Sequence, residues 1–276
     1  MKPSETPITK GSKLKVSQPE IDIGRGTIHC TLQGVGPPVC LMSTLQGTWS
    51  AEARLLRKNY TVLTYDMRGF GDSINREDGF PSNEAQAEDL VDILNHLGWK
   101  KIALVGLSHG GAVAQHFAAH FGDYLRSLVI VSSFAKASGS TLIFLRLLHG
   151  FLVRSELDTF WEVLKAFLCS EPNLAQLLRM EPQLKRLMFE QYTCESLRHI
   201  YECSLQQNTC GILGQIRVPT LIIGGEADML FPPRITAEIT ALIPNAQEKL
   251  LPTAHVPPVE NLRTFHSTLM SFLETT

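Results

Sequence analysis

The sequence predicts an α/β fold with a mostly parallel central sheet and helices on both of its faces. Short apolar runs of strand length recur between glycines and prolines, and segments with helical periodicity alternate with them. The runs are apolar at successive positions rather than at every second one, which is typical of parallel strands buried on both faces. The runs span residues 39–42, 61–65, 102–106, 128–132 and 220–224, and a further strand is expected over residues 247–251.

The segment 83–97 is the clearest helix. Asn83 occupies the expected N-cap position, Gln86 follows three residues later, apolar residues recur on one face, and Gly98 ends the helix. Ahead of the sheet, residues 21–33 predict an antiparallel hairpin around a Gly-Arg-Gly turn. Further core helices are expected over residues 109–121, 232–243 and 260–274.

A long stretch between the fourth and fifth runs shows helical periodicity and no convincing strand. It is too long for a simple connection and is rich in Leu, Phe and Met. We therefore expect an inserted helical cap over residues 135–216, laid across the carboxyl ends of the strands. The α/β core then comprises residues 18–134 and 217–276, and the polar residues 1–17 are expected to be a disordered lead-in.

The composition is that of an ordinary globular protein. The 276 residues are 44% hydrophobic and 19% charged, with a formal net charge of -2, which argues against a nucleic-acid partner. No apolar run is long enough to span a bilayer, and the N-terminus has no apolar core of a secretory signal. Six cysteines are scattered without zinc spacing, so we expect reduced thiols, a cytoplasmic protein, and no metal or cofactor. The oligomeric state stays open.

Ser108 lies at the centre of a Gly-Leu-Ser-His-Gly segment that follows the apolar run 101–105 and precedes a helix. This strand-turn-helix context is what a nucleophile elbow needs, because the sharp turn requires small residues at Gly106 and Gly110. A G-x-S-x-G match alone is weak. Its position between a buried strand and a helix of small residues favours a catalytic serine.

A serine hydroxyl needs a base to take its proton, and the base needs an acid to orient it. Asp228 follows the run 220–224, and His255 follows the last predicted strand, so both can reach the sheet edge beside Ser108. Taken singly, a loop aspartate is more often a turn residue and a histidine more often a packed side chain. Their order along the chain favours Ser108, His255 and Asp228 as the catalytic residues, with Glu226 as the competing acid.

From about residue 37 to the end, the chain resembles the α/β-hydrolase superfamily, in particular its lid-bearing esterase, lactonase and thioesterase branch. The resemblance is carried by Tyr-Asp-Met-Arg-Gly-Phe-Gly-Asp-Ser at 65–73, the Ser108 elbow, Gly-Glu-Ala-Asp at 225–228, and Ala-His at 254–255 with Glu260 and Phe265 after it. It covers the core but not the cap. For the first segment it implies a structural role, in which Asp66, Arg68 and Ser73 brace loops.

The resemblance also implies an oxyanion hole made of two backbone N–H groups. One belongs to the residue after the nucleophile, His109, and the other to the turn after the third strand, near Leu45. The family usually has His-Gly at that turn, whereas this chain has Ser43 and Thr44. Losing the glycine can change the turn and move the donor amide.

The leading functional hypothesis is a serine hydrolase that forms an acyl-enzyme on Ser108 from an ester, thioester or lactone with a lipophilic acyl group. Its substrate is a small acyl compound, either free or carried as a thioester. The alternative is an acyltransferase that passes a (hydroxy)acyl chain from a thioester to an acceptor other than water. A ligand-binding protein on the same fold is the third reading, against which the intact set of catalytic residues argues.

Overall fold

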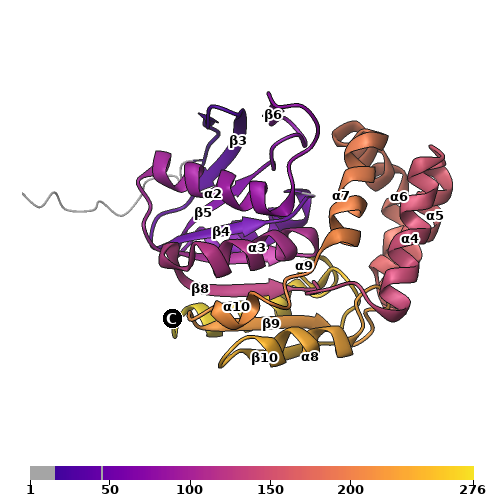
Figure 1. Ribbon diagram of the computed structural model, residues 1–276. Helices are drawn as coiled ribbons and strands as arrows, with labels where there is room; N and C mark the ends of the chain where they lie inside the picture. The colour runs from indigo at the N-terminus through magenta and orange to yellow at the C-terminus, as the bar shows by residue number, and fades with distance from the viewer. Residues whose placement is uncertain (1–15, 45) are drawn as a thin grey trace, which may run out of the picture.

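The computed structural model describes residues 16–44 and 46–276. Within these residues the strands join into one mixed sheet, whose strands are spread in Figure 1 from β3 at the top to β10 at the bottom. The strands are β1 (Val16–Ser17), β2 (Glu20–Asp22), β3 (Gly26–Gln33), β4 (Pro38–Met42), β5 (Thr61–Tyr65), β6 (Ile74–Asn75), β7 (Ile102–Leu107), β8 (Leu125–Val131), β9 (Thr220–Gly225) and β10 (Gln247–Leu251).

The central part of the sheet is parallel, as its continuous apolar runs predict. Strands β5, β4, β7, β8, β9 and β10 lie side by side in this order, and each pair runs parallel. Strand β3 pairs antiparallel with β5 and β6 on one side and with β1 and β2 on the other, which confirms the expected hairpin. The fold is therefore the predicted α/β class, with an antiparallel extension at one edge.

Helices cover both faces of the sheet. The apolar residues of α2, α3 and α8 pack on one face, and those of α1 and α10 pack on the other, each set meeting alternate residues of the strands. The core helices are α1 (Ser50–Leu56), α2 (Asn83–Leu97), α3 (His109–His120), α8 (Pro233–Leu242), α9 (Pro257–Glu260) and α10 (Leu262–Leu273), with short 3₁₀ turns η1 (Gln46–Trp49), η2 (Gly122–Tyr124) and η3 (Leu213–Gln215).

Two helix boundaries differ from the sequence prediction. The N-cap of α2 is Ser82, whose hydroxyl accepts a hydrogen bond from the Ala85 N–H, while the Asn83 side chain donates to Gln207 instead. The last helix is also split, because Asn261 leaves the helical conformation and caps α10 with its side chain. An asparagine that can cap a new helix competes with continuing the old one.

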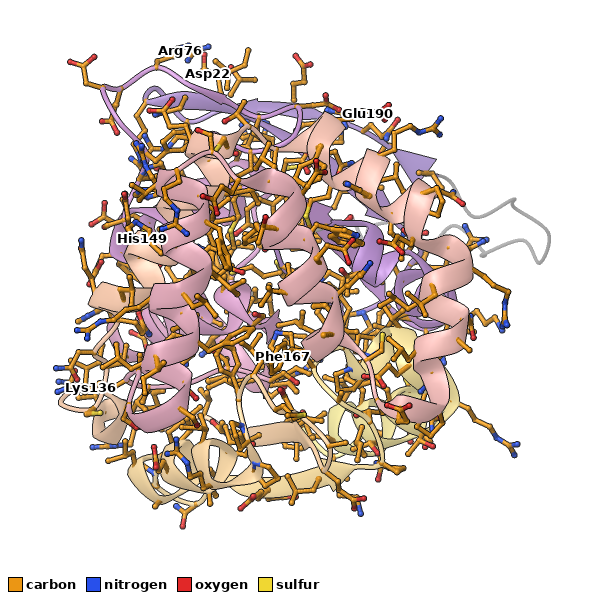
Figure 2. The ribbon with its side chains drawn as sticks, turned by 90° about the vertical axis from the view of Figure 1, so that its right-hand side faces the viewer. Asp22, Arg76, Lys136, His149, Phe167 and Glu190 are labelled. Atoms are coloured by element: carbon orange, nitrogen blue, oxygen red, sulfur yellow. The ribbon has the colours of Figure 1, made fainter. Side chains whose placement is uncertain are left out.

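Four helices lie between β8 and β9 in the chain, and we call them the insertion. They stand beyond the ends of the central strands toward which the β8 and β9 arrows point (Figure 1), and Figure 2 looks onto them. At the base of the insertion, Lys136 and Asn208 form an antiparallel bridge where the chain leaves and re-enters the core. The helices are α4 (Gly139–Val153), α5 (Leu157–Leu168), α6 (Glu171–Gln191) and α7 (Cys194–Gln206).

The insertion falls inside the predicted cap, residues 135–216, whose status as a separate domain stays a prediction. Most of the predicted lead-in lies outside the described residues. Its last two residues, Val16 and Ser17, form β1 and pair with β3. In the described part of the chain, no helix combines the length and the apolar character needed to cross a bilayer.

The 65–73 segment braces loops, as the family resemblance implies. The Ser73 hydroxyl donates to the Asp66 carbonyl (2.7 Å) and accepts from the His29 N–H (2.9 Å). Arg68 is buried, and its Nε lies 2.9 Å from the buried Asp89 carboxylate. Burying this charge is tolerated because it is paired. These residues stabilise the β5 end of the sheet and do not line the Ser108 cavity.

Candidate active site

Ser108 occupies a sharp turn between β7 and α3. Its φ of 55° and ψ of -117° place a non-glycine residue in a conformation that costs about 1–3 kcal/mol. The Ser108 N–H donates to the Val131 carbonyl of the neighbouring strand, at 2.9 Å, and so holds the turn. A Cβ at Gly106 would lie 2.5 Å from the Gly110 carbonyl oxygen, and one at Gly110 would lie 2.3 Å from the Met42 carbonyl oxygen. The elbow therefore requires both glycines, as predicted.

The structure brings Ser108, His255 and Asp228 together in one hydrogen-bonded chain. His255 Nε2 lies 3.0 Å from the Ser108 Oγ, and His255 Nδ1 lies 3.0 Å from the Asp228 Oδ2. A carboxylate can only accept, so Nδ1 carries the proton and Nε2 is left to accept from the serine hydroxyl. This geometry is that of a serine nucleophile, its base, and the acid that orients the base.

Hydrogen bonds hold both oxygens of the Asp228 carboxylate in place. Oδ1 accepts the backbone N–H groups of Leu230 and Phe231, both at 2.9 Å. The side chain is completely buried, so these bonds and the imidazole are what compensate its lost hydration. Glu226, the competing acid, is exposed on the same loop. The structure therefore places Asp228, and not Glu226, against His255.

His255 is fixed from two further directions. The Phe231 ring stands edge-on to the imidazole, with ring centroids 5.0 Å apart. The preceding residue, Ala254, donates its N–H to the Glu260 Oε1 at 2.8 Å. The Glu260 carboxylate therefore anchors the loop from which His255 projects.

The first predicted oxyanion donor, the N–H of His109, lies at the first residue of α3. An N–H at that position has no acceptor within its helix, and it adjoins the positive end of the helix dipole. The His109 side chain is buried, and burial lowers the pKa of its imidazole to about 4, so it is neutral at neutral pH. The second predicted donor, Leu45, lies outside the described residues. Beside it, the Thr44 carbonyl accepts a hydrogen bond from the Tyr192 hydroxyl.

Ser108 opens onto a cavity of about 120 Å³ between the core and the insertion. Ser43, Ser108 and His255 form part of its polar end. The rest of its lining is mostly apolar, and much of it comes from the insertion: Leu145, Phe160, Leu164, Met188, Leu197 and Ile200. Part of the apolar helical pattern of the insertion therefore faces the nucleophile rather than serving only as packing.

Helix α6 is attached to the core at both of its ends. At its N-cap, the Ser170 N–H donates to the Glu260 Oε2 at 2.7 Å, and the Asn173 side-chain amide lies 3.3 Å from the same oxygen. At its C-cap, Tyr192 donates to Thr44. One end is thus tied to the His255 loop, and the other to the turn predicted to form the oxyanion hole.

Sequence reasoning did not identify Glu260, Ser170 or Tyr192 as residues of the site. The spacing of Glu260, five residues after His255, is a local signal that could have suggested its contact with the histidine loop. No signal in the sequence pairs Tyr192 with Thr44, which lies 148 positions earlier. Among the described residues, no group of three His, Cys, Asp or Glu side chains is arranged to hold a metal ion.

Comparisons with known proteins agree with this fold. Residues 37–155 match the family model of the α/β hydrolase fold. The chain is 26% identical to lipase 1 of Psychrobacter immobilis, over 82% of this chain and 74% of the lipase. It is 25% identical to a pimeloyl-[acyl-carrier protein] methyl ester esterase of Vibrio atlanticus, over 90% of this chain and 98% of the esterase.

Solved structures show the same fold. A thermophilic esterase from Thermogutta terrifontis has a TM-score of 0.82 at 24% identity, covering 94% of this chain and 98% of the esterase. An enol-lactonase from Burkholderia xenovorans has a TM-score of 0.83 at 18% identity, covering 93% of this chain and 100% of the lactonase.

The fold and the names of the relatives support a hydrolase. The fold of the chain is that of the α/β hydrolases, whose family model matches residues 37–155.

Proposed function

We propose that this chain is a serine hydrolase that cleaves an ester, thioester or lactone with a lipophilic acyl group, through an acyl-enzyme on Ser108. The observation that carries the proposal is the hydrogen-bonded chain from Asp228 through His255 to Ser108, which ends at an apolar cavity. Relatives named lipase and methyl ester esterase support ester substrates for this chain as well.

In the first half of the reaction, the Ser108 Oγ forms a bond to the acyl carbon and its proton passes to His255 Nε2. The electron pair of the carbonyl moves onto its oxygen, and the His109 N–H stabilises that negative charge. When the carbonyl re-forms, the bond to the alcohol or thiol breaks, and the leaving group takes the proton from His255. The product is an acyl ester of Ser108.

In the second half, His255 takes a proton from water while the water oxygen attacks the acyl carbon. The same N–H stabilises the second oxyanion. Collapse breaks the bond to Ser108, whose oxygen recovers the proton, and the free acid leaves. Asp228 keeps Nδ1 protonated throughout, so Nε2 can alternate between base and acid.

The apolar lining of the cavity supports an acyl group longer than acetyl. Each methylene buried there contributes about 0.8 kcal/mol, which is close to a fourfold gain in kcat/KM per carbon before ordering costs are subtracted. We expect kcat/KM to rise along p-nitrophenyl acetate, butyrate, hexanoate and octanoate. A maximum at acetate would refute the lipophilic substrate while leaving the serine mechanism intact.

The direct test is mass spectrometry of the intact protein after mixing with p-nitrophenyl butyrate and with butyryl thioesters. A transient mass increase of one butyryl group that is absent in Ser108→Ala supports the acyl-enzyme. Hydrolysis that survives in Ser108→Ala overturns it. Adding a hydroxy acid distinguishes the two acceptors: release of free butyric acid supports hydrolysis, and a butyryl ester of the hydroxy acid would instead show acyl transfer.

A further inference from the structure

A second and larger cavity runs along α6, on the side that faces the core. Its volume is about 600 Å³, several times that of the Ser108 cavity. Helix α6 contributes Leu177, Met180, Leu184 and Leu187, which recur at spacings of three and four and so form one stripe along the helix. We call this cavity the α6 groove. Glu190, labelled in Figure 2, lies near the C-terminal end of α6.

The opposite wall of the α6 groove comes from η1 and α9. It includes Thr48, Val256 and Val259, of which Val259 is more than half exposed. Arg54 and Glu260 are the charged residues that line the groove. The Glu260 carboxylate already accepts the N–H groups of Ala254 and Ser170, so it is not free to bind a cationic ligand.

The α6 groove adjoins the Ser108 cavity. Four residues line both spaces: Thr48, Leu168, Met188 and Val256. Val256 directly follows the histidine of the hydrogen-bonded chain, so the junction lies beside the nucleophile. Met188 faces it from α6, and a methionine side chain is flexible enough to make room for a ligand. A shift of the Met188 side chain would therefore let one ligand extend from Ser108 into the groove.

From the lining residues that the two spaces share and from the apolar stripe, we propose that the α6 groove binds the distal part of an unbranched hydrocarbon chain whose scissile ester or thioester lies at Ser108. The proposal rests on the proposed function and extends it: the cavity at Ser108 takes the first carbons, and the groove takes the rest. Exposed apolar residues such as Met180 and Leu187 are then covered when a long substrate binds.

The first experiment compares two substitutions on α6. Leu187, which lines the groove, is 40% exposed, and Leu178, which does not line it, is 47% exposed. Each has a glutamate three residues further along the helix, so Leu187→Glu and Leu178→Glu face the same local repulsion. We measure kcat/KM for p-nitrophenyl dodecanoate and butyrate and take the ratio of the two.

Leu187→Glu is expected to lower the dodecanoate-to-butyrate ratio at least tenfold, because a charged group then faces the chain. Leu178→Glu is expected to leave the ratio within twofold of wild type. Equal ratios in all three proteins would overturn the groove as a chain site. A second series replaces p-nitrophenyl dodecanoate with dodecyl butyrate, whose long chain is on the alcohol. Leu187→Glu should lower the ratio only in the series whose long chain enters the groove. The comparison therefore tells whether that chain belongs to the acyl group or to the alcohol.

The second experiment does not depend on catalysis and uses Ser108→Ala. Trp161 lines the α6 groove, and its Nε1 donates to Glu181 at 2.8 Å. Bromine quenches tryptophan fluorescence on contact, so 12-bromododecanoate is expected to quench Trp161, and 4-bromobutyrate is expected not to. The quenching should disappear in Trp161→Phe. In Leu187→Glu, the same quenching should require an at least tenfold higher concentration of 12-bromododecanoate.

The two experiments separate failure of the groove from failure of the proposed function. If wild type hydrolyses no ester but 12-bromododecanoate quenches Trp161, the serine hydrolase proposal fails and the groove stands as a binding site for hydrocarbon chains. If esters are hydrolysed through Ser108 but Trp161 is not quenched, the groove proposal is wrong.

Discussion

Replacing Asp228 with Asn tests how strictly the acid controls the tautomer of His255. In the structure, Oδ1 accepts two backbone N–H groups, from Leu230 and Phe231, and Oδ2 faces His255 Nδ1. If the asparagine oxygen keeps the two backbone bonds, its NH₂ must face Nδ1. The imidazole then has to accept at Nδ1 and carry its proton on Nε2, where it can no longer take the proton of Ser108.

The alternative is to turn the amide round, and the structure sets the cost of doing so. The NH₂ would then meet the two backbone N–H groups and leave both without an acceptor. Each buried N–H left unpaired costs about 1–3 kcal/mol, so the turned amide costs about 2–6 kcal/mol. The wrong tautomer itself costs about 10⁴-fold in rate, and 1.4 kcal/mol corresponds to tenfold. Because the cheaper route dominates, we expect kcat to fall by about 30-fold to 10⁴-fold.

The assay is hydrolysis of p-nitrophenyl butyrate, with ¹⁵N NMR of the imidazole to read the tautomer and circular dichroism to verify the fold. Glu226→Gln is the matched control, since Glu226 is an exposed carboxylate two residues away, and it should leave kcat unchanged. A folded Asp228→Asn protein with kcat within tenfold of wild type would refute the reasoning. So would an NMR spectrum that shows Nδ1 still protonated.

Three further predictions concern the nucleophile, the histidine loop and a buried carboxylate. Ser108→Ala and Ser108→Gly should both lose labelling by a fluorophosphonate. In urea unfolding, the Gly variant should be more stable than the Ala variant by about 1–3 kcal/mol, since only glycine is relaxed at a φ of 55°. Equal stability of the two variants would argue against strain at the elbow. Glu260→Gln should lower the free energy of unfolding by about 1–3 kcal/mol, because the NH₂ group of the glutamine must face a backbone N–H. The same substitution should lower kcat more than it changes KM. An unchanged kcat would show that Glu260 does not position His255. Burial raises the pKa of Glu52, so the folded protein keeps this proton at a pH where the unfolded chain has lost it, and the free energy of unfolding falls as pH rises through that window. Glu52→Gln should flatten this fall in unfolding measured between about pH 4 and 7, and an identical slope in both proteins would contradict the assignment.

The sequence predicts the parallel sheet well because its signals are local. Each buried strand is a run of apolar residues, and the elbow at Ser108 needs glycines within two positions. The meeting of Ser108, Asp228 and His255 follows from one topological fact, that parallel strands deliver their carboxyl ends to the same edge. Order along the chain therefore predicts proximity in space.

The contacts of the insertion could not be predicted in the same way. Periodicity shows that a helix such as α6 has an apolar stripe, but it does not show whether that stripe meets the core, another helix or a cavity. The bonds of Tyr192 to Thr44 and of Ser170 to Glu260 join residues far apart in sequence and carry no local pattern. The break at Asn261 was missed for a different reason, since capping by asparagine and continuation of a helix have similar sequence signals.

The attachment of α6 at both ends limits how freely the insertion can be exchanged between relatives. A chimaera that receives a foreign helix in place of residues 170–192 loses the Asn173 side-chain amide beside Glu260 at one junction and the Tyr192 hydroxyl that donates to Thr44 at the other. It would thereby disturb two loops of a core whose sequence had not been touched. Moving α6 from this protein into a relative therefore also requires a carboxylate at the position of Glu260, so that the unit of exchange is larger than the insertion itself.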